Sequence, residues 1–287
     1  MPRFAICNET WGDLPFADTC RQIAAAGYEG VEIAPFTLAK EFGRNADGLT
    51  SGERQQIRQS AEDAGLKIVG LHWLLVPPPD SLHLTTSDDQ MRQRTAEYLR
   101  SLADLCADLG GTILVLGSPK QRSLADDVSE AVGAAHFLQT IGPCLEICKA
   151  RGITLCLEPL GPDETNFINT LADAQTLIAA ANNSACRTIF DVKAAATEGK
   201  SFAQLIADHA DVIAHVHAND VNRRGPGFGD TNFVPIFAAL DQIGYDKGYD
   251  RWVSVEVFDY APDPDTIARV SLQTLKSANL QSKGAVS

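Results

Sequence analysis

The chain has 287 residues, of which 45% are hydrophobic and 21% charged, and its formal net charge is -13. This balance excludes a disordered chain and a small disulfide-dependent fold, because enough apolar residues are present for a large core. The negative charge argues against nucleic-acid binding, since the protein would repel a phosphate backbone. No apolar run reaches the ~18 residues of a membrane span, and the first residues lack the apolar stretch of a signal peptide. We therefore expect a cytoplasmic protein with no membrane partner.

Short apolar segments alternate along the chain with longer amphipathic segments. The expected strands are Phe4–Cys7, Val31–Ala34, Lys67–Leu71, Thr112–Leu116, Ile153–Glu158, Thr188–Asp191, Val212–His217 and Trp252–Val257. The expected helices are Phe16–Ala26, Glu53–Ala64, a segment with the stripe from Tyr98 to Leu109, Ala134–Ala150, Leu171–Ala181, Phe202–Ala207, Phe233–Ile243 and Thr266–Ala278. Eight such alternations predict an α/β protein with a closed parallel (β/α)8 TIM barrel. No linker divides the chain, so we expect one domain over residues 1–287.

Each of the later strands ends in one ionisable residue: Glu158, Asp191, His217 and Glu256. The active sites of barrel enzymes lie where strands end, because the loops after the strands converge there. A buried unpaired carboxylate costs several kcal/mol, so four such residues at equivalent positions indicate a shared metal site. Two Glu, one Asp and one His suit Mn2+, Co2+ or Mg2+, and Zn2+ less well. A polar layer satisfied within the barrel is the alternative.

Four segments carry a resemblance to a known family, and they follow one another at intervals of 33, 26 and 39 residues: Leu157-Glu158-Pro159, Ile189-Phe190-Asp191, His215-Val216-His217 and Val255-Glu256-Val257. They resemble the xylose isomerase-like TIM-barrel superfamily, in particular its ketose 3-epimerase and sugar isomerase branch. The resemblance covers nearly the whole chain. It implies that the four residues bind one divalent metal, usually Mn2+. It also implies a keto-sugar substrate, and relatives are often homo-oligomers.

In that family the two matching glutamates, Glu158 and Glu256, move a proton at the carbon beside the substrate carbonyl. The chemistry is physically reasonable, because a metal stabilises the developing enediolate while a positioned carboxylate removes the proton. Two carboxylates on opposite faces of the carbon would allow one to remove the proton and the other to return it with inverted configuration. We therefore predict a metal-dependent isomerase or epimerase that acts on a keto sugar or similar polyhydroxy carbonyl compound.

The resemblance also implies substrate contacts by Glu164 and Arg223, which lie six residues beyond Glu158 and His217. A solvated loop charge is the alternative for each. The chain departs from the ketose epimerases at Ala194, where they carry a histidine that contacts the substrate. The neighbouring Lys193 is a candidate replacement donor.

Loops after the early strands can complete the pocket. His72 and Trp73 end the third strand and offer an aromatic wall with a polar donor, and the segment Pro77-Pro78-Pro79 is long enough to contribute a lid. After the fourth strand, Lys120 and Arg122 are expected to bind a carboxylate, phosphate or polyhydroxy group. Core packing for His72 and helix-start charges for the two cations are the alternatives.

Four further polar residues lie at or inside expected strands. Asn8 and Glu9 end the first strand, and Glu32 lies inside the second, where it either belongs to the site or pairs with Lys120 or Arg122. His215 alternates with His217, so both side chains should face the same side of the strand. We expect His215 to orient a metal ligand without binding the metal itself.

Three other functions remain open on the same scaffold. A lyase would begin with the same proton removal and then expel a group beta to the carbonyl, in a dehydration or a 3-keto-glycoside cleavage. An apurinic-site endonuclease shares the barrel, but it needs additional histidines and a basic groove. A barrel kept only for binding or assembly would not need all four ligand types.

Overall fold

The computed structural model describes residues 2–76, 82–245 and 251–284. Its eight strands are parallel, each pairs with the next in chain order, and β8 closes on β1. The predicted (β/α)8 TIM barrel is therefore confirmed. The strands are β1 (Arg3–Cys7), β2 (Gly30–Ile33), β3 (Lys67–Leu71), β4 (Ile113–Leu116), β5 (Thr154–Leu157), β6 (Cys186–Asp191), β7 (Ile213–Ala218) and β8 (Trp252–Val255).

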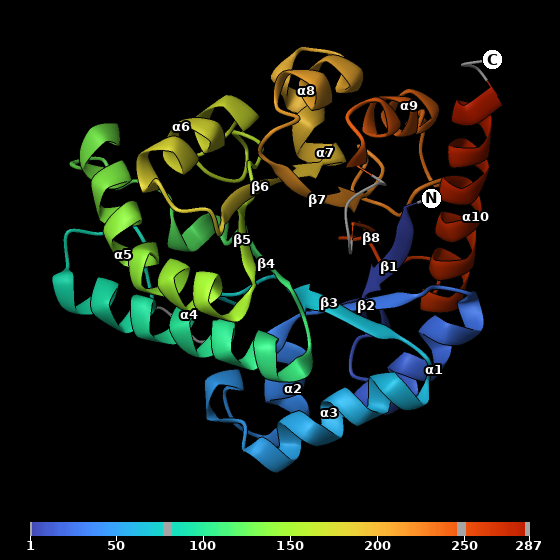
Figure 1. Ribbon diagram of the computed structural model, residues 1–287, viewed down its shortest axis with the longest axis horizontal. Helices are drawn as coiled ribbons and strands as arrows, with labels where there is room; N and C mark the ends of the chain where they lie inside the picture. The colour runs from blue at the N-terminus through green and yellow to red at the C-terminus, as the bar shows by residue number, and fades with distance from the viewer. Residues whose placement is uncertain (1, 77–81, 246–250, 285–287) are drawn as a thin grey trace.

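Helices surround this barrel (Figure 1). Within the described ranges they are α1 (Phe16–Ala26), α2 (Pro35–Phe42), α3 (Ser51–Asp63), α4 (Asp89–Leu109), α5 (Glu130–Arg151), α6 (Leu171–Ala181), α7 (Val192–Ala195), α8 (Phe202–Asp208), α9 (Val234–Gln242) and α10 (Pro264–Gly284). Short 3-10 helices are η1 (Asn8–Trp11), η2 (Ala46–Gly48), η3 (Pro119–Gln121) and η4 (Ala196–Glu198). The sequence did not predict α2 or α7. In the described ranges no helix is both long and apolar enough to cross a membrane.

Two apolar clusters form the core. The larger one lies between the outer faces of the strands and the helices. The smaller one joins residues from six different strands, which can meet only inside the barrel: Ala5, Val69, Ile113, Val115, Cys156, Ile189 and Trp252. The guanidinium of Arg3 lies over the Trp252 ring at 4.0 Å, at the amino end of the strands. The amino end of the barrel is therefore filled, and the polar residues gather at the carboxyl end.

Local irregularities in the sheet adjust which side chains point inward. The pairing of β2 with β3 shifts between Val31 and Glu32, and that of β6 with β7 shifts between Thr188 and Ile189. Such bulges re-aim the residues beside them. Strands β3 and β4 approach so closely at Gly70 that a Cβ there would lie 1.9 Å from the carbonyl oxygen of Ile113. Only glycine fits at this position.

Candidate metal centre and active site

Four side chains from consecutive strands meet at the carboxyl end of the barrel. Glu158 directly follows β5, Asp191 ends β6, His217 lies in β7, and Glu256 directly follows β8. One ligand atom from each of the four residues lies within 4.8 Å of the other three, and all four residues are buried. The structure therefore brings together the set that the sequence singled out.

The charges of this cluster fit a divalent cation. Burial raises the pKa of Asp191 to about 7, and the nearby carboxylates of Glu158 and Glu256 add to the effect. Three carboxylates in so small a buried space repel one another unless a positive charge lies between them. Oxygen ligands with one imidazole match the preferences of Mn2+ and similar ions. Asp191 is also oriented, since its carboxylate accepts hydrogen bonds from Ala194 N at 2.7 Å and Asn219 Nδ2 at 2.7 Å.

The ring of His217 is oriented by a carboxylate behind it. Its Nδ1 faces the cluster, 3.1 Å from Glu256 Oε2 and 3.4 Å from Glu158 Oε1, while its Nε2 lies 3.1 Å from Glu32 Oε1. His215 Nε2 lies 2.9 Å from the other oxygen of Glu32. Burial opposes a charge on Glu32, but the two imidazoles hold its pKa well below the usual range. The expected pairing of Glu32 with Lys120 or Arg122 is therefore wrong, because histidines of β7 occupy both its oxygens.

The carboxylate of Glu256 is held in place by neighbouring side chains. Glu256 Oε1 accepts a hydrogen bond from Trp73 Nε1 at 2.8 Å and lies 3.3 Å from His72 Nδ1. His72 Nε2 lies 3.0 Å from Glu9 Oε2. Although burial opposes the imidazolium, the charge of Glu9 and the hydrogen bond to Glu256 raise the pKa of His72 to about 10. His72 is fully buried, and its two ring nitrogens face Glu9 and Glu256, whereas the sequence predicted a contact with substrate.

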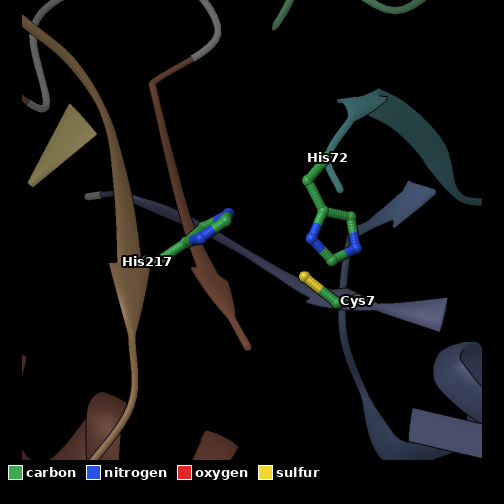
Figure 2. A group of neighbouring side chains, drawn as sticks. All are labelled: Cys7, His72 and His217. Carbon is green, nitrogen blue, oxygen red and sulfur yellow. The ribbon is translucent and has the colours of Figure 1, made fainter. Parts of the chain in front are cut away.

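Two further groups of potential ligands lie beside the cluster: Glu32 with His215 and His217, and Cys7 with His72 and His217. Figure 2 shows Cys7, His72 and His217, which come from three separate strands or strand ends and face a common space. Burial and the neighbouring acids Glu9 and Glu32 raise the pKa of the Cys7 thiol well above its ordinary value. A protonated thiol is a poor metal ligand, and the ring nitrogens of both histidines already face carboxylates. The four-residue cluster, with its three carboxylates and one imidazole, is therefore the stronger candidate for a cation site.

The position of Glu158 depends on its neighbours in the preceding loop. A Cβ at Gly117 would lie 2.1 Å from Glu158 Oε2, so the carboxylate occupies space that only glycine leaves open. Arg122 donates to the backbone oxygens of Glu158 at 2.6 Å and Ile168 at 3.0 Å, and it is fully buried. Burial lowers the pKa of its guanidinium to about 10. Arg122 therefore holds the main chain at Glu158 and Ile168, whereas the sequence predicted that it binds a carboxylate, phosphate or polyhydroxy group.

Polar and aromatic side chains lie next to the four-residue cluster. Lys193 Nζ donates to Glu164 Oε2 at 2.6 Å and lies 4.5 Å from the centre of the Phe258 ring. That ring stacks against Trp73, with centroids 6.1 Å apart. Burial opposes the charge on Lys193, but Asp191 and Glu164 raise its pKa. Lys193 thus lies beside the expected substrate residue Glu164, next to the buried Ala194.

The remaining expected substrate residues, Arg223 and Lys120, have no contact with the cluster among the described interactions. Arg223 is exposed and donates to Asp163 Oδ2 at 2.6 Å, and Lys120 is exposed in η3. Asn8 supports the loop after β2, because its side chain bonds Thr37 Oγ1 and Ala34 N at 2.8 Å each. The proposed lid Pro77-Pro78-Pro79 falls outside the described residues.

Sequence reasoning did not single out three residues that shape the site: Asn219, Gly117 and Phe258. Asn219 holds the carboxylate of Asp191 and accepts a hydrogen bond from Lys193 N at 2.8 Å. Its position two residues after His217 was an available signal, because residues two apart share a face of a strand. Gly117 and Phe258 carry no comparable signal in the sequence.

Comparison with protein families and solved structures gives consistent results. Residues 20–278 match the family model described as xylose isomerase-like TIM barrel. A solved structure of L-ribulose 3-epimerase superimposes with a TM-score of 0.84, covering 100% of this chain and 97% of that one at 20% identity. At this identity the superposition supports the fold alone.

Two curated relatives are sugar epimerases by name. D-psicose 3-epimerase of Agrobacterium fabrum is 23% identical over 80% of this chain and 76% of its own length. The 3-dehydro-D-guloside 4-epimerase of Escherichia coli is 33% identical, over 46% of this chain and 49% of its own length. The chain is thus similar to epimerases that differ in the carbon they invert.

Proposed function

Because the chain belongs to the xylose isomerase-like TIM barrel family, we propose that it is a divalent-metal-dependent epimerase or isomerase of a keto sugar or similar polyhydroxy carbonyl compound. Its named relatives are carbohydrate epimerases, and the chain is accordingly assigned as an enzyme that acts on sugars. The observation that carries the proposal is the buried cluster of Glu158, Asp191, His217 and Glu256.

In this proposal the four cluster residues hold the cation, with Mn2+ the favoured ion. When bound, such a cation would polarise a substrate carbonyl and stabilise negative charge that develops on its oxygen. The protein prepares this site in advance. Glu32 orients His217, and Asn219 orients Asp191, so little rearrangement is needed when a cation and a sugar bind.

Glu158 and Glu256 are the proposed acid and base. Both carboxylates converge on Nδ1 of His217, at 3.4 and 3.1 Å, although they enter from β5 and β8. A carbon held between them could lose a proton to one and regain a proton from the other. Trp73 and His72 fix the orientation of Glu256. Lys193 and Glu164 are placed to bind substrate hydroxyls, as a donor and an acceptor that lie side by side.

Deuterium uptake from D2O, followed by NMR, tests the proposal. The Mn2+-loaded protein would be incubated with a panel of ketoses, ketose phosphates and 3-keto-glycosides. We expect deuterium at a carbon next to the carbonyl in at least one compound. Glu158→Gln and Glu256→Gln should each slow this exchange by 100-fold or more, which is within the usual contribution of acid–base catalysis.

Glu62→Gln is the matched control, because Glu62 is an exposed glutamate of α3 paired only with Arg58 in the described structure. Exchange that persists in both active-site variants, or that does not need metal, would contradict the assignment. The products distinguish the outcomes of proton removal. An epimer or isomer supports the proposal, whereas an unsaturated product or a released leaving group would indicate a lyase on the same scaffold.

A further inference from the structure

A cavity of about 690 Å³ lies at the carboxyl end of the barrel, beside the cluster of Glu158, Asp191, His217 and Glu256. It is bordered by η1 and the residues that follow it up to Phe16, by α2 after β2, and by the segment after β8. Its aromatic lining comes from Trp11, Phe36 and Tyr260. Among the described residues, none of the four cluster residues lines it. The cavity is therefore a neighbouring space and not the metal centre itself.

Two chains of contacts join the cavity to the cluster. Glu9 lines the cavity and lies 3.0 Å from His72 Nε2, and His72 Nδ1 lies 3.3 Å from Glu256 Oε1. On the aromatic side the Phe36 ring is 5.8 Å from the ring of Trp73, whose Nε1 donates to Glu256. The cavity is therefore separated from Glu256 by only one or two side chains, and a substituent that extends past them from a sugar at the cluster would reach it.

The lining indicates what kind of group would bind there. Two apolar lining side chains are unusually exposed, with Tyr260 at 41% and Leu14 at 39%, so a ligand ring could cover them. Aromatic faces bind rings of sugars and aryl groups alike.

The charges of the lining exclude an anionic group. The acids that line the cavity are Glu9, Asp13 and Glu41, and its one lysine, Lys40, is paired with Asp13. Glu41 accepts a hydrogen bond from Phe16 N at 2.9 Å. The balance is negative, so a phosphate or carboxylate would be repelled and would find no cation free of an acidic partner among these residues.

We propose that this cavity is a second subsite, which binds a neutral, ring-bearing substituent of the sugar held at the four-residue cluster. The substrate is then a glycoside and not a free monosaccharide. This inference rests on the proposed function for its first subsite. The volume of the cavity falls within the range of about 300–1,000 Å³ that is typical of pockets for drug-sized ligands.

Binding to the full-length, Mn2+-loaded protein tests the subsite without any reaction. The ligands would be methyl, phenyl and 4-carboxyphenyl β-D-glucoside and the disaccharide cellobiose, with affinities measured by calorimetry and by saturation-transfer NMR. We expect the phenyl glucoside or cellobiose to bind at least about 5-fold more tightly than the methyl glucoside. Preference for phenyl would identify an aryl substituent, and preference for cellobiose a second sugar. The carboxyphenyl compound should bind more weakly than phenyl.

Tyr260→Ala should remove most of this preference, while Tyr260→Phe keeps the ring and should retain it. Leu280→Ala, at an exposed leucine of α10, is the control for loss of a surface apolar side chain. Equal affinities for all neutral ligands, or a preference that survives Tyr260→Ala, would overturn the subsite. The 3-keto forms of the same ligands are then tested for deuterium exchange. A preference without exchange would contradict the proposed function alone, and exchange without a preference would contradict the subsite alone.

Discussion

Gly117→Ala is a test of whether the position of Glu158 governs activity. The added Cβ would lie 2.1 Å from Glu158 Oε2, whereas such contacts normally begin at 3.0–3.4 Å. The carboxylate of Glu158 must therefore move away by about 1 Å, because it lies at the end of a flexible side chain, whereas the backbone at Gly117 is not flexible. Gly117 is not among the residues with positive φ, so alanine adds no backbone strain.

A shift of about 1 Å in a reacting group typically costs about 100-fold in rate. We expect a comparable loss of deuterium exchange in Gly117→Ala. Mn2+ affinity should also fall by about 10- to 100-fold, because one ligand leaves its position. The assays are NMR exchange and calorimetric titration with Mn2+. Thermal unfolding of the metal-free protein should change little, because the clash is relieved by one side chain.

The matched control is Gly142→Ala, which adds a methyl group inside α5 with no atom within 4 Å. It should keep both exchange and Mn2+ affinity. The reasoning would be refuted if Gly117→Ala retained both properties, or if it lost them only together with the folded state.

Three further results are expected. Mn2+ affinity should fall by up to about tenfold for each pH unit below 7, because the pKa of Asp191 is raised to about 7 and protons compete with the cation. Calorimetry across pH 5.5–8 measures this affinity, and an affinity that does not change with pH would contradict the prediction. Glu32→Gln should weaken Mn2+ binding by about 10- to 100-fold, because an amide cannot accept from both histidine rings. An affinity equal to that of the unchanged protein would exclude this role for Glu32. Gly70→Ala should destabilise the protein by at least about 2 kcal/mol in urea, because its Cβ meets the backbone oxygen of Ile113 at 1.9 Å; an unchanged midpoint would mean that β3 and β4 can separate at no cost.

The sequence alone predicted the barrel and the cluster because both leave a local signal. Each later strand is a short apolar run, and a single ionisable residue at its end stands out, as at Glu158 and Glu256. Helices α1 and α6 begin and end where their apolar periodicity predicts. In contrast α2 is only 8 residues long and starts at Pro35, directly after a strand, so it gives too little periodicity to detect.

The partners of the buried polar residues could not be predicted. Glu32 meets His215 across 183 residues of sequence, a contact that depends on closure of the barrel. Likewise, the position of Arg122 in the loop after the fourth strand suggested that it binds a carboxylate, phosphate or polyhydroxy group. Nothing local indicates that two backbone carbonyls will surround its guanidinium. Residue types therefore identified the centre, while the surrounding contacts required the fold.

The buried guanidinium of Arg122 also bears on how this scaffold can change its substrate. Loops of TIM barrels are commonly regarded as independent modules, but Arg122 in the loop after β4 supports the main chain at Glu158, after β5. Transplanting the β4 loop alone would remove that support. The loops that border the cavity, after β1, β2 and β8, carry no such tie to Glu158 among the described contacts. Divergence or redesign of this scaffold should therefore exchange the β4 and β5 loops only as a pair.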